Sequence, residues 1–209
     1  MHYPMLFFKK ILPCFGILIL LSACNSTHPQ NVNIEQVSNT DTKPKESIST
    51  PLTTKEIDDY YQTIEGNLSN YSLEKRRYTN GDHTENYVQI DFEIYYKTDK
   101  ASPSKLKIIG GEEVFRMETS YYFKANQLIL VHNKEEEMEE PYYENKIYYQ
   151  TGSIVNALEK KPAANLSFEK TPYHPHQEFT TNSKAFEQQQ DKLYQQYMDY
   201  FSQAEIVPE

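Results

Sequence analysis

YFKANQLI (residues 122–129) and YYQTGSIV (residues 148–155) align without a gap, 26 residues apart in the chain. Each unit begins with aromatic residues, continues through a short polar turn and ends with aliphatic residues. Asn126 and Gly152 stand where a tight hairpin turn requires a positive φ, which these residue types adopt readily. A weaker third copy with a longer turn begins at Tyr95. The repeated unit predicts consecutive antiparallel β-hairpins.

The surrounding region, from Tyr71 to about Leu158, alternates with a period of two residues and is rich in aromatic and β-branched side chains. Gly110-Gly111 indicates a bend or a bulge. We therefore expect a meander of antiparallel strands. The predicted strands cover residues 71–78, 87–97, 105–109, 113–124, 127–134, 143–150 and 153–159.

Helices are predicted on both sides of this meander. The sequence from Thr53 to Glu56 has the form of a capping box, and apolar residues then recur at helical spacing, which indicates a helix over about residues 53–65. A second helix follows a cap at Asn182 or Ser183, with Phe186, Leu193, Tyr197 and Phe201 on one side. The predicted fold class is α+β: an antiparallel β-meander sheet with an N-terminal and a C-terminal flanking helix, in one domain over residues 52–205.

The first 23 residues are typical of a signal peptide. Basic residues precede an apolar stretch at residues 11–21, which is shorter than a membrane-spanning helix requires. The following sequence, Leu21-Ser22-Ala23-Cys24, resembles the lipobox of bacterial lipoproteins. This resemblance implies cleavage between Ala23 and Cys24, diacylglycerol on the sulfur of Cys24, and a fatty acyl group such as palmitate on its amino group. The alternative is an uncleaved membrane helix that happens to end at a cysteine.

Residues 24–51 are mostly polar and cannot bury enough apolar surface to offset the entropy of ordering them. We expect a disordered tether with a span on the order of 30 Å between the lipid and the domain. The residue after the cysteine is Asn25, and by resemblance to Gram-negative sorting rules this implies the outer membrane, with the protein facing the periplasm.

Cysteine content and charge exclude several function classes. The chain has two cysteines, and Cys14 would be removed with the signal peptide, so Cys24 cannot form an intramolecular disulfide. Removal of Lys9 and Lys10 takes the formal charge from −9 to −11. A nucleic-acid partner is not expected for such an acidic chain, because phosphate binding requires clustered cations. The predicted partners are the membrane, through lipidated Cys24, and an envelope protein.

Two clusters in the sequence contain residue types that can bind metal ions. His174 and His176 have the spacing of metal ligands on a strand, but a solvated proline-rich loop explains them without a metal, and His83 and His132 are distant in sequence. The five glutamates around Met138, over residues 135–140, lack the spacing of a calcium loop and fit a charged hairpin tip. No catalytic motif is found, so neither catalytic residues, nor metal ligands, nor a cofactor is predicted.

Tyrosine is abundant, with 18 residues in 209, and occurs in several adjacent pairs. Neighbours on a strand face opposite sides, so each pair is expected to place one ring in the core and one outside. The outer rings would form an aromatic binding surface, or they would only stabilise the sheet as cross-strand pairs. The candidate binding surface comprises Tyr95, Tyr96, Tyr121, Tyr122, Tyr148 and Tyr149.

The tyrosine-rich hairpins over residues 110–160 resemble a group of uncharacterised bacterial secreted and lipid-anchored proteins, and this resemblance supplies no catalytic residues. Together these features predict a membrane-tethered, non-enzymatic envelope lipoprotein that acts as a protein-interaction module. Two alternatives stay open: a carrier or sensor of an apolar ligand, and a metal-assisted hydrolase that uses His174 and His176.

Overall fold

The computed structural model describes residues 50–81, 87–97, 102–112, 114–138, 140–163 and 165–208. The predictions made for the signal peptide, for cleavage after Ala23, for lipidation of Cys24 and for most of the tether lie outside the described residues, as does His83.

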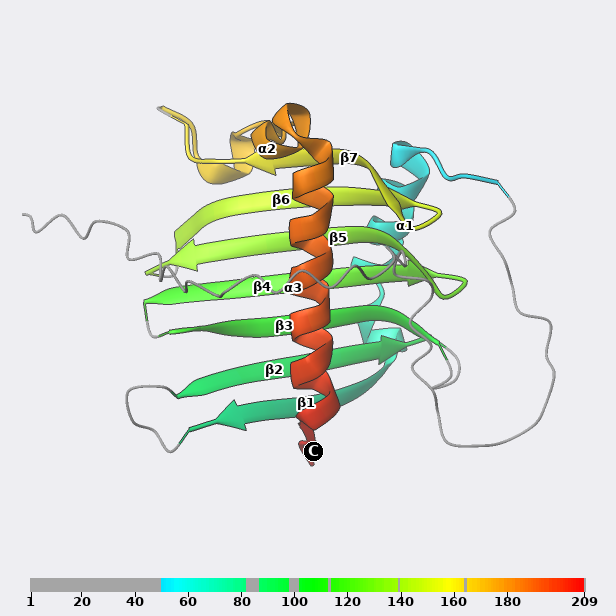
Figure 1. Ribbon diagram of the computed structural model, residues 1–209, viewed down its shortest axis with the longest axis vertical. Coiled ribbons are helices and arrows are strands. Elements are labelled where there is room, and N and C mark those ends of the chain that lie inside the picture. The colour runs from blue at the N-terminus through cyan, green and yellow to red at the C-terminus, as the bar shows by residue number, and fades with distance from the viewer. Residues whose placement is uncertain are drawn as a thin grey trace, which may run out of the picture.

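The described residues form a nine-stranded antiparallel sheet. Figure 1 shows its long strands side by side. Seven long strands each pair with their neighbours in sequence, and a two-residue strand closes each edge, giving the order β8-β7-β6-β5-β4-β3-β2-β1-β9. The predicted α+β meander is confirmed. The strands are β1 (Ser72–Asn80), β2 (Val88–Tyr96), β3 (Pro103–Glu112), β4 (Phe115–Lys124), β5 (Gln127–Glu137), β6 (Glu140–Gln150), β7 (Ser153–Lys160), β8 (His174–Pro175) and β9 (Glu205–Ile206).

The two repeated units form the predicted hairpins. Both central turn residues have positive φ in each case: Ala125 and Asn126 at 50° and 62°, and Thr151 and Gly152 at 48° and 87°. This is the backbone of a type I′ turn, whose twist matches that of the strands it joins.

One of the two alternatives given for Gly110-Gly111, the bulge, was wrong. Gly110-Gly111 is not a bulge, because β3 and β4 pair in continuous register through it. Gly111 is required because a Cβ atom would lie 2.1 Å from the carbonyl oxygen of Phe115. The glutamates around Met138 do lie at a hairpin tip, as predicted, because Glu137 and Glu140 are cross-strand partners on either side of the β5–β6 turn. Glu135 and Glu136 extend β5 toward this tip by pairing with Met117 and Arg116 of β4.

The helices begin where the sequence indicates. In α1 (Thr54–Glu65), the Thr53 hydroxyl accepts from the Glu56 N–H at 3.2 Å, and the Glu56 carboxylate accepts from the Thr53 N–H at 2.7 Å. In α3 (Ser183–Gln203), the Asn182 side chain caps the N-terminus by accepting from the Ala185 N–H. The remaining helical segments are short: η1 (Leu68–Asn70), η2 (Phe168–Lys170) and α2 (Gln177–Thr181).

The two long helices lie on opposite sides of the sheet, so the domain has three layers (Figure 1). The side we call the α3 face contributes the larger apolar cluster, which includes Phe92, Tyr121 and Tyr149 beneath Phe186 and Tyr197 of α3. The opposite side, the α1 face, contributes a smaller cluster of Tyr122, Ile129, Leu130 and Tyr148 beneath Ile57, Tyr61 and Ile64 of α1.

Candidate functional site

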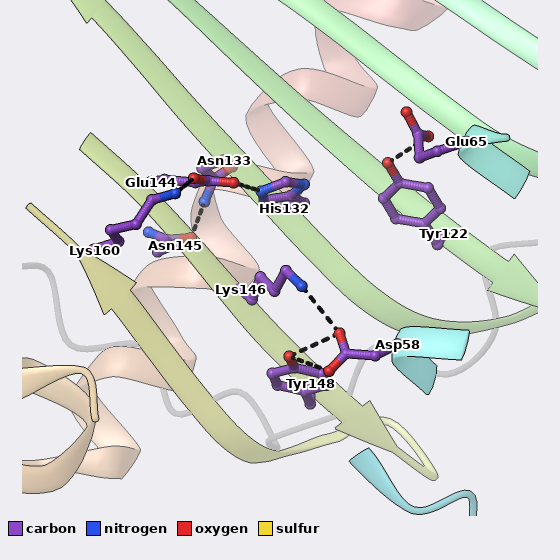
Figure 2. A network of polar contacts seen from close by, with 10 residues as sticks. All are labelled: Asp58, Glu65, Tyr122, His132, Asn133, Glu144, Asn145, Lys146, Tyr148 and Lys160. Atoms are coloured by element: carbon purple, nitrogen blue, oxygen red, sulfur yellow. Dashed lines mark hydrogen bonds and ion pairs between the residues drawn. The ribbon is translucent and has the colours of Figure 1, made fainter. Parts of the chain in front are cut away.

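The α1 face contains a network of charged and polar side chains beside its small apolar cluster (Figure 2). Asp58 of α1 accepts from the Lys146 ammonium at 3.0 Å and from the Tyr148 hydroxyl at 3.1 Å. Lys146 and Tyr148 are two residues apart on β6 and therefore point to the same face. One carboxylate of the helix is thus bound by a lysine and a tyrosine of the sheet.

A second contact of the same kind lies two helical turns further along α1. Glu65 accepts from the Lys105 ammonium at 2.7 Å and from the Tyr122 hydroxyl at 2.8 Å. Lys105 on β3 and Tyr122 on β4 are direct cross-strand partners. Burial lowers the pKa of Lys105, and the ion pair with Glu65 opposes that change. The two carboxylates fix the axial position of α1 on the sheet, because a shift by one turn would break both contacts.

The most buried titratable pair is His132 on β5 and Glu144 on β6. The side chain of His132 is 3% exposed, and its Nε2 lies 2.5 Å from Glu144 Oε1, while Lys160 lies 2.6 Å from Oε2 of the same carboxylate. Burial lowers the pKa of His132. Burial opposes ionisation of Glu144, but hydrogen bonds from His132, Lys160 and Tyr173 hold the pKa of Glu144 well below its usual range. We therefore assign a neutral imidazole that donates to an ionised carboxylate.

Aromatic rings enclose this network. The ring of Tyr61 meets the rings of Tyr122 and His132 edge-on, with centroids 5.2 Å and 5.3 Å apart. The ammonium of Lys160 lies 4.4 Å from the ring centroid of Phe168, which belongs to the segment after β7. These contacts limit the access of water and strengthen the ion pairs within.

Ser120, the cross-strand partner of His132, gives this face a serine, a histidine and a glutamate on three adjacent strands. These are the residue types of acyl-transfer sites. However, Ser120 and His132 are 2% and 3% exposed beneath α1, so a substrate carbonyl cannot reach the serine while the helix is in place. The arrangement explains the position of α1 better than it explains catalysis.

The predicted exposed tyrosine surface was wrong. Alternation does separate each pair, because Tyr96, Tyr121 and Tyr149 join the α3 face whereas Tyr122 and Tyr148 join the α1 face. Both faces are covered by helices, however, and these five residues are between 1% and 8% exposed. Tyr95 is half-buried, and its hydroxyl donates to Glu93 at 2.8 Å.

The two histidines of the predicted metal-like motif have different surroundings. His174 is exposed on the edge strand β8, whereas His176 is 5% exposed and lies 3.0 Å from the Tyr143 hydroxyl through its Nε2. Burial lowers the pKa of His176. Within the part of the chain that the structure describes, no group of three or more His, Cys, Asp or Glu residues is placed to hold a metal ion.

Sequence reasoning missed the contacts of His132, although the predicted hairpin contained a signal for them. The register of β5 with β6 pairs His132 with Lys146. Glu144 lies two residues before Lys146 on β6 and therefore on the same face of the sheet. Finding these neighbours requires the one-residue register shift between Glu135 and Glu136 as well as the position of the turn, and the sequence did not indicate that shift. The contacts with Asp58 and Glu65 have no comparable local signal.

The chain matches no family model, no curated protein and no solved structure among those with which it was compared. Among the described residues, no helix combines the length and the apolar character needed to cross a membrane.

Proposed function

We propose that this protein is a lipid-anchored lipoprotein of the bacterial cell envelope whose domain acts as a non-enzymatic protein-interaction module. The observation that carries the proposal is the sequence Leu21-Ser22-Ala23-Cys24 at the end of an apolar stretch, followed by a polar segment that leads to the capped start of α1. Two or more acyl chains on Cys24 would anchor the chain stably, whereas one chain binds a membrane only weakly.

The attachment of α1 supports a tethered domain. The side chain of Gln150, at the end of β6, donates to the carbonyl oxygen of Leu52, immediately before the helix. Asp58 and Glu65 then bind the sheet through lysine and tyrosine side chains. The segment that would lead to the membrane is thereby joined to the sheet at the start of the domain. A pulling force on the tether would therefore act on these contacts and on the sheet.

The charged network supports a structural role for the α1 face. Its lysines and carboxylates bind one another, and Lys105 and His132 each have a side chain that is 3% exposed. Buried ion pairs contribute little net stability, but they can specify the register of packed elements. We assign this role to the network, and we expect partners to bind elsewhere on the domain.

Lipidation is tested by feeding cells an alkyne-labelled fatty acid and comparing the chain with its Cys24→Ala and Cys14→Ala variants. We expect label and cleavage in the parent protein and in Cys14→Ala, and an unlabelled, uncleaved precursor in Cys24→Ala. Label that persists in Cys24→Ala, or a parent protein that keeps its first 23 residues, would contradict the proposal. Separation of inner and outer membranes in a Gram-negative host then tests the expected outer-membrane location.

A further inference from the structure

Three exposed apolar residues lie at one end of the sheet, and we call them the Met138 surface. They are Val114 at the β3–β4 turn, Met138 at the β5–β6 turn and Tyr142 near the start of β6, which are 55%, 74% and 48% exposed. The Met138 N–H donates to the Val114 carbonyl oxygen at 2.8 Å. This bond joins two neighbouring hairpins, so their tips form one connected surface.

An apolar residue is unusual in such a turn. Hairpin turns generally use Gly, Asn and Asp, and the turns at the opposite end of the sheet place the small or polar residues Ala125-Asn126 and Thr151-Gly152 at their centres, with no large apolar side chain. Met138 also has a φ of 51°, in the left-handed region where Asn or Gly would fit with less strain. A flexible thioether side chain that is exposed in this way suits an adaptable binding contact.

The charge around the Met138 surface restricts what can bind there. Glu137 and Glu140 are exposed beside Met138, and Glu136 is partly exposed. Arg116 is the cross-strand partner of Glu136 and lies 4.0 Å from Glu118. A second copy of the chain would bring like charges together, and an anionic membrane surface would be repelled in the same way. The complementary occupant is a protein that presents cations around an apolar recess.

The Met138 surface faces away from the start of the domain. Leu52 contacts Gln150 at the end of β6, whereas Met138 lies just before the start of β6. An eleven-residue strand separates the two ends by roughly 35 Å. On a chain anchored through residues N-terminal to Leu52, this surface would point away from the attachment point.

We propose that the Met138 surface docks a protein partner that carries lysine or arginine residues around an apolar recess. The inference rests on the proposed interaction function and names its surface and its partner chemistry. Val114, Met138 and Tyr142 would supply the apolar contact, and the neighbouring glutamates would select against acidic partners and orient a basic one.

The test is site-specific photo-crosslinking in intact cells, with p-benzoylphenylalanine at position 138, 142 or 155. Val155 on β7 is 44% exposed and serves as the matched control. We expect one protein to be crosslinked from positions 138 and 142 but not from 155, with lysine or arginine near the crosslinked site on its surface. The Glu136→Lys/Glu137→Lys variant should reduce this adduct at least fivefold without changing the amount of folded protein.

Binding of the identified protein to the purified chain then gives a second readout. Met138→Ser should weaken binding roughly tenfold, as expected for a central apolar contact, and Val155→Ser should leave it unchanged. The proposal would be overturned by equal crosslinking from all three positions. It would also be overturned if the adduct contained a second copy of the chain or a lipid, or if the Glu136→Lys/Glu137→Lys variant left the adduct unchanged. The fatty-acid label tests the anchor independently of this surface. If the label is lost in Cys24→Ala but no protein is crosslinked from position 138, the anchor is supported and the Met138 surface is rejected as a docking site.

Discussion

The two faces of the sheet are built from the same alternating strands but are filled differently. The α3 face is covered by a 21-residue helix over rings and aliphatic side chains. The α1 face is covered by a 12-residue helix, and lysines, carboxylates and a histidine lie around its small apolar cluster. Apolar burial stabilises the first face, whereas the second depends on the pairing of charges that would be costly if left alone.

The largest expected effect is on the α3 face. Phe92 is fully buried, so Phe92→Ala removes apolar contacts and leaves a cavity. We expect a loss of about 4 kcal/mol in the free energy of unfolding, measured by urea denaturation. The control is Val88→Ala on the same strand, where the side chain is 39% exposed and the loss should stay below about 0.5 kcal/mol. A loss below about 1 kcal/mol in Phe92→Ala would mean that the α3 face is loosely packed.

Removal of one partner in the charged network should come next. Glu144→Gln takes the negative charge away from Lys160 while His132 stays buried beside it. We expect the free energy of unfolding to fall by about 3 kcal/mol, because the buried ammonium of Lys160 is then left without its counter-charge. Glu140→Gln, at an exposed position, is the control and should be nearly neutral. Equal losses in the two variants would show that the network is open to water.

The pair formed by Lys105 and Glu65 tests whether charges or packing position α1. Glu65→Leu leaves Lys105 unpaired, and the side chain of this lysine is only 3% exposed. The free energy of unfolding should therefore fall by about 2 kcal/mol. Lys105→Met should cost less, because the Glu65 side chain is 29% exposed and water can solvate its carboxylate. The double variant should recover most of the loss, and additive losses in this cycle would argue against direct coupling.

The smallest expected effect is a pH dependence that arises from His132. Burial lowers the pKa of the folded imidazole below its ordinary value of 6.5, so between these two pKa values the unfolded chain binds a proton that the folded chain does not. The free energy of unfolding should therefore fall as the pH drops below about 6.5, with a limiting slope of about 1.4 kcal/mol per pH unit for one such group.

His132→Asn should reduce this slope even if the variant is less stable at every pH. His176, whose pKa is also lowered by burial, contributes in the same direction and would keep part of the slope. An unchanged slope in His132→Asn would mean that the folded imidazole is protonated over the same range.

Local signals in the sequence predicted most of the fold. The type I′ turns at Asn126 and Gly152 marked the positions of their hairpins, and the capping box at Thr53 marked the start of α1. These features act over a few residues, so they can be recognised without knowledge of the tertiary structure. The two-residue strands β8 and β9 were missed because they pair with residues far away in the chain.

The candidate site was much less accessible to sequence reasoning. Alternation predicts correctly that Tyr121 and Tyr122 face opposite sides, but it does not state whether a side is covered. The contacts that cover the α1 face join residues far apart in sequence, such as Asp58 with Lys146 and Glu65 with Lys105. Burial of the tyrosines therefore depends on long-range packing that no local pattern encodes.

The order of the strands also has a consequence for how the chain folds. Each strand from β1 to β7 pairs with its neighbour in sequence, so hairpins can form from short loops as soon as they are synthesised. The α3 face is covered mainly by residues 183–203, and the outer edge of β1 pairs with β9 from residues 205–206. A nascent chain that still lacks residues 183–206 keeps its largest apolar surface open to chaperones. The domain therefore completes its folding only after residues 183–206 are available to pack.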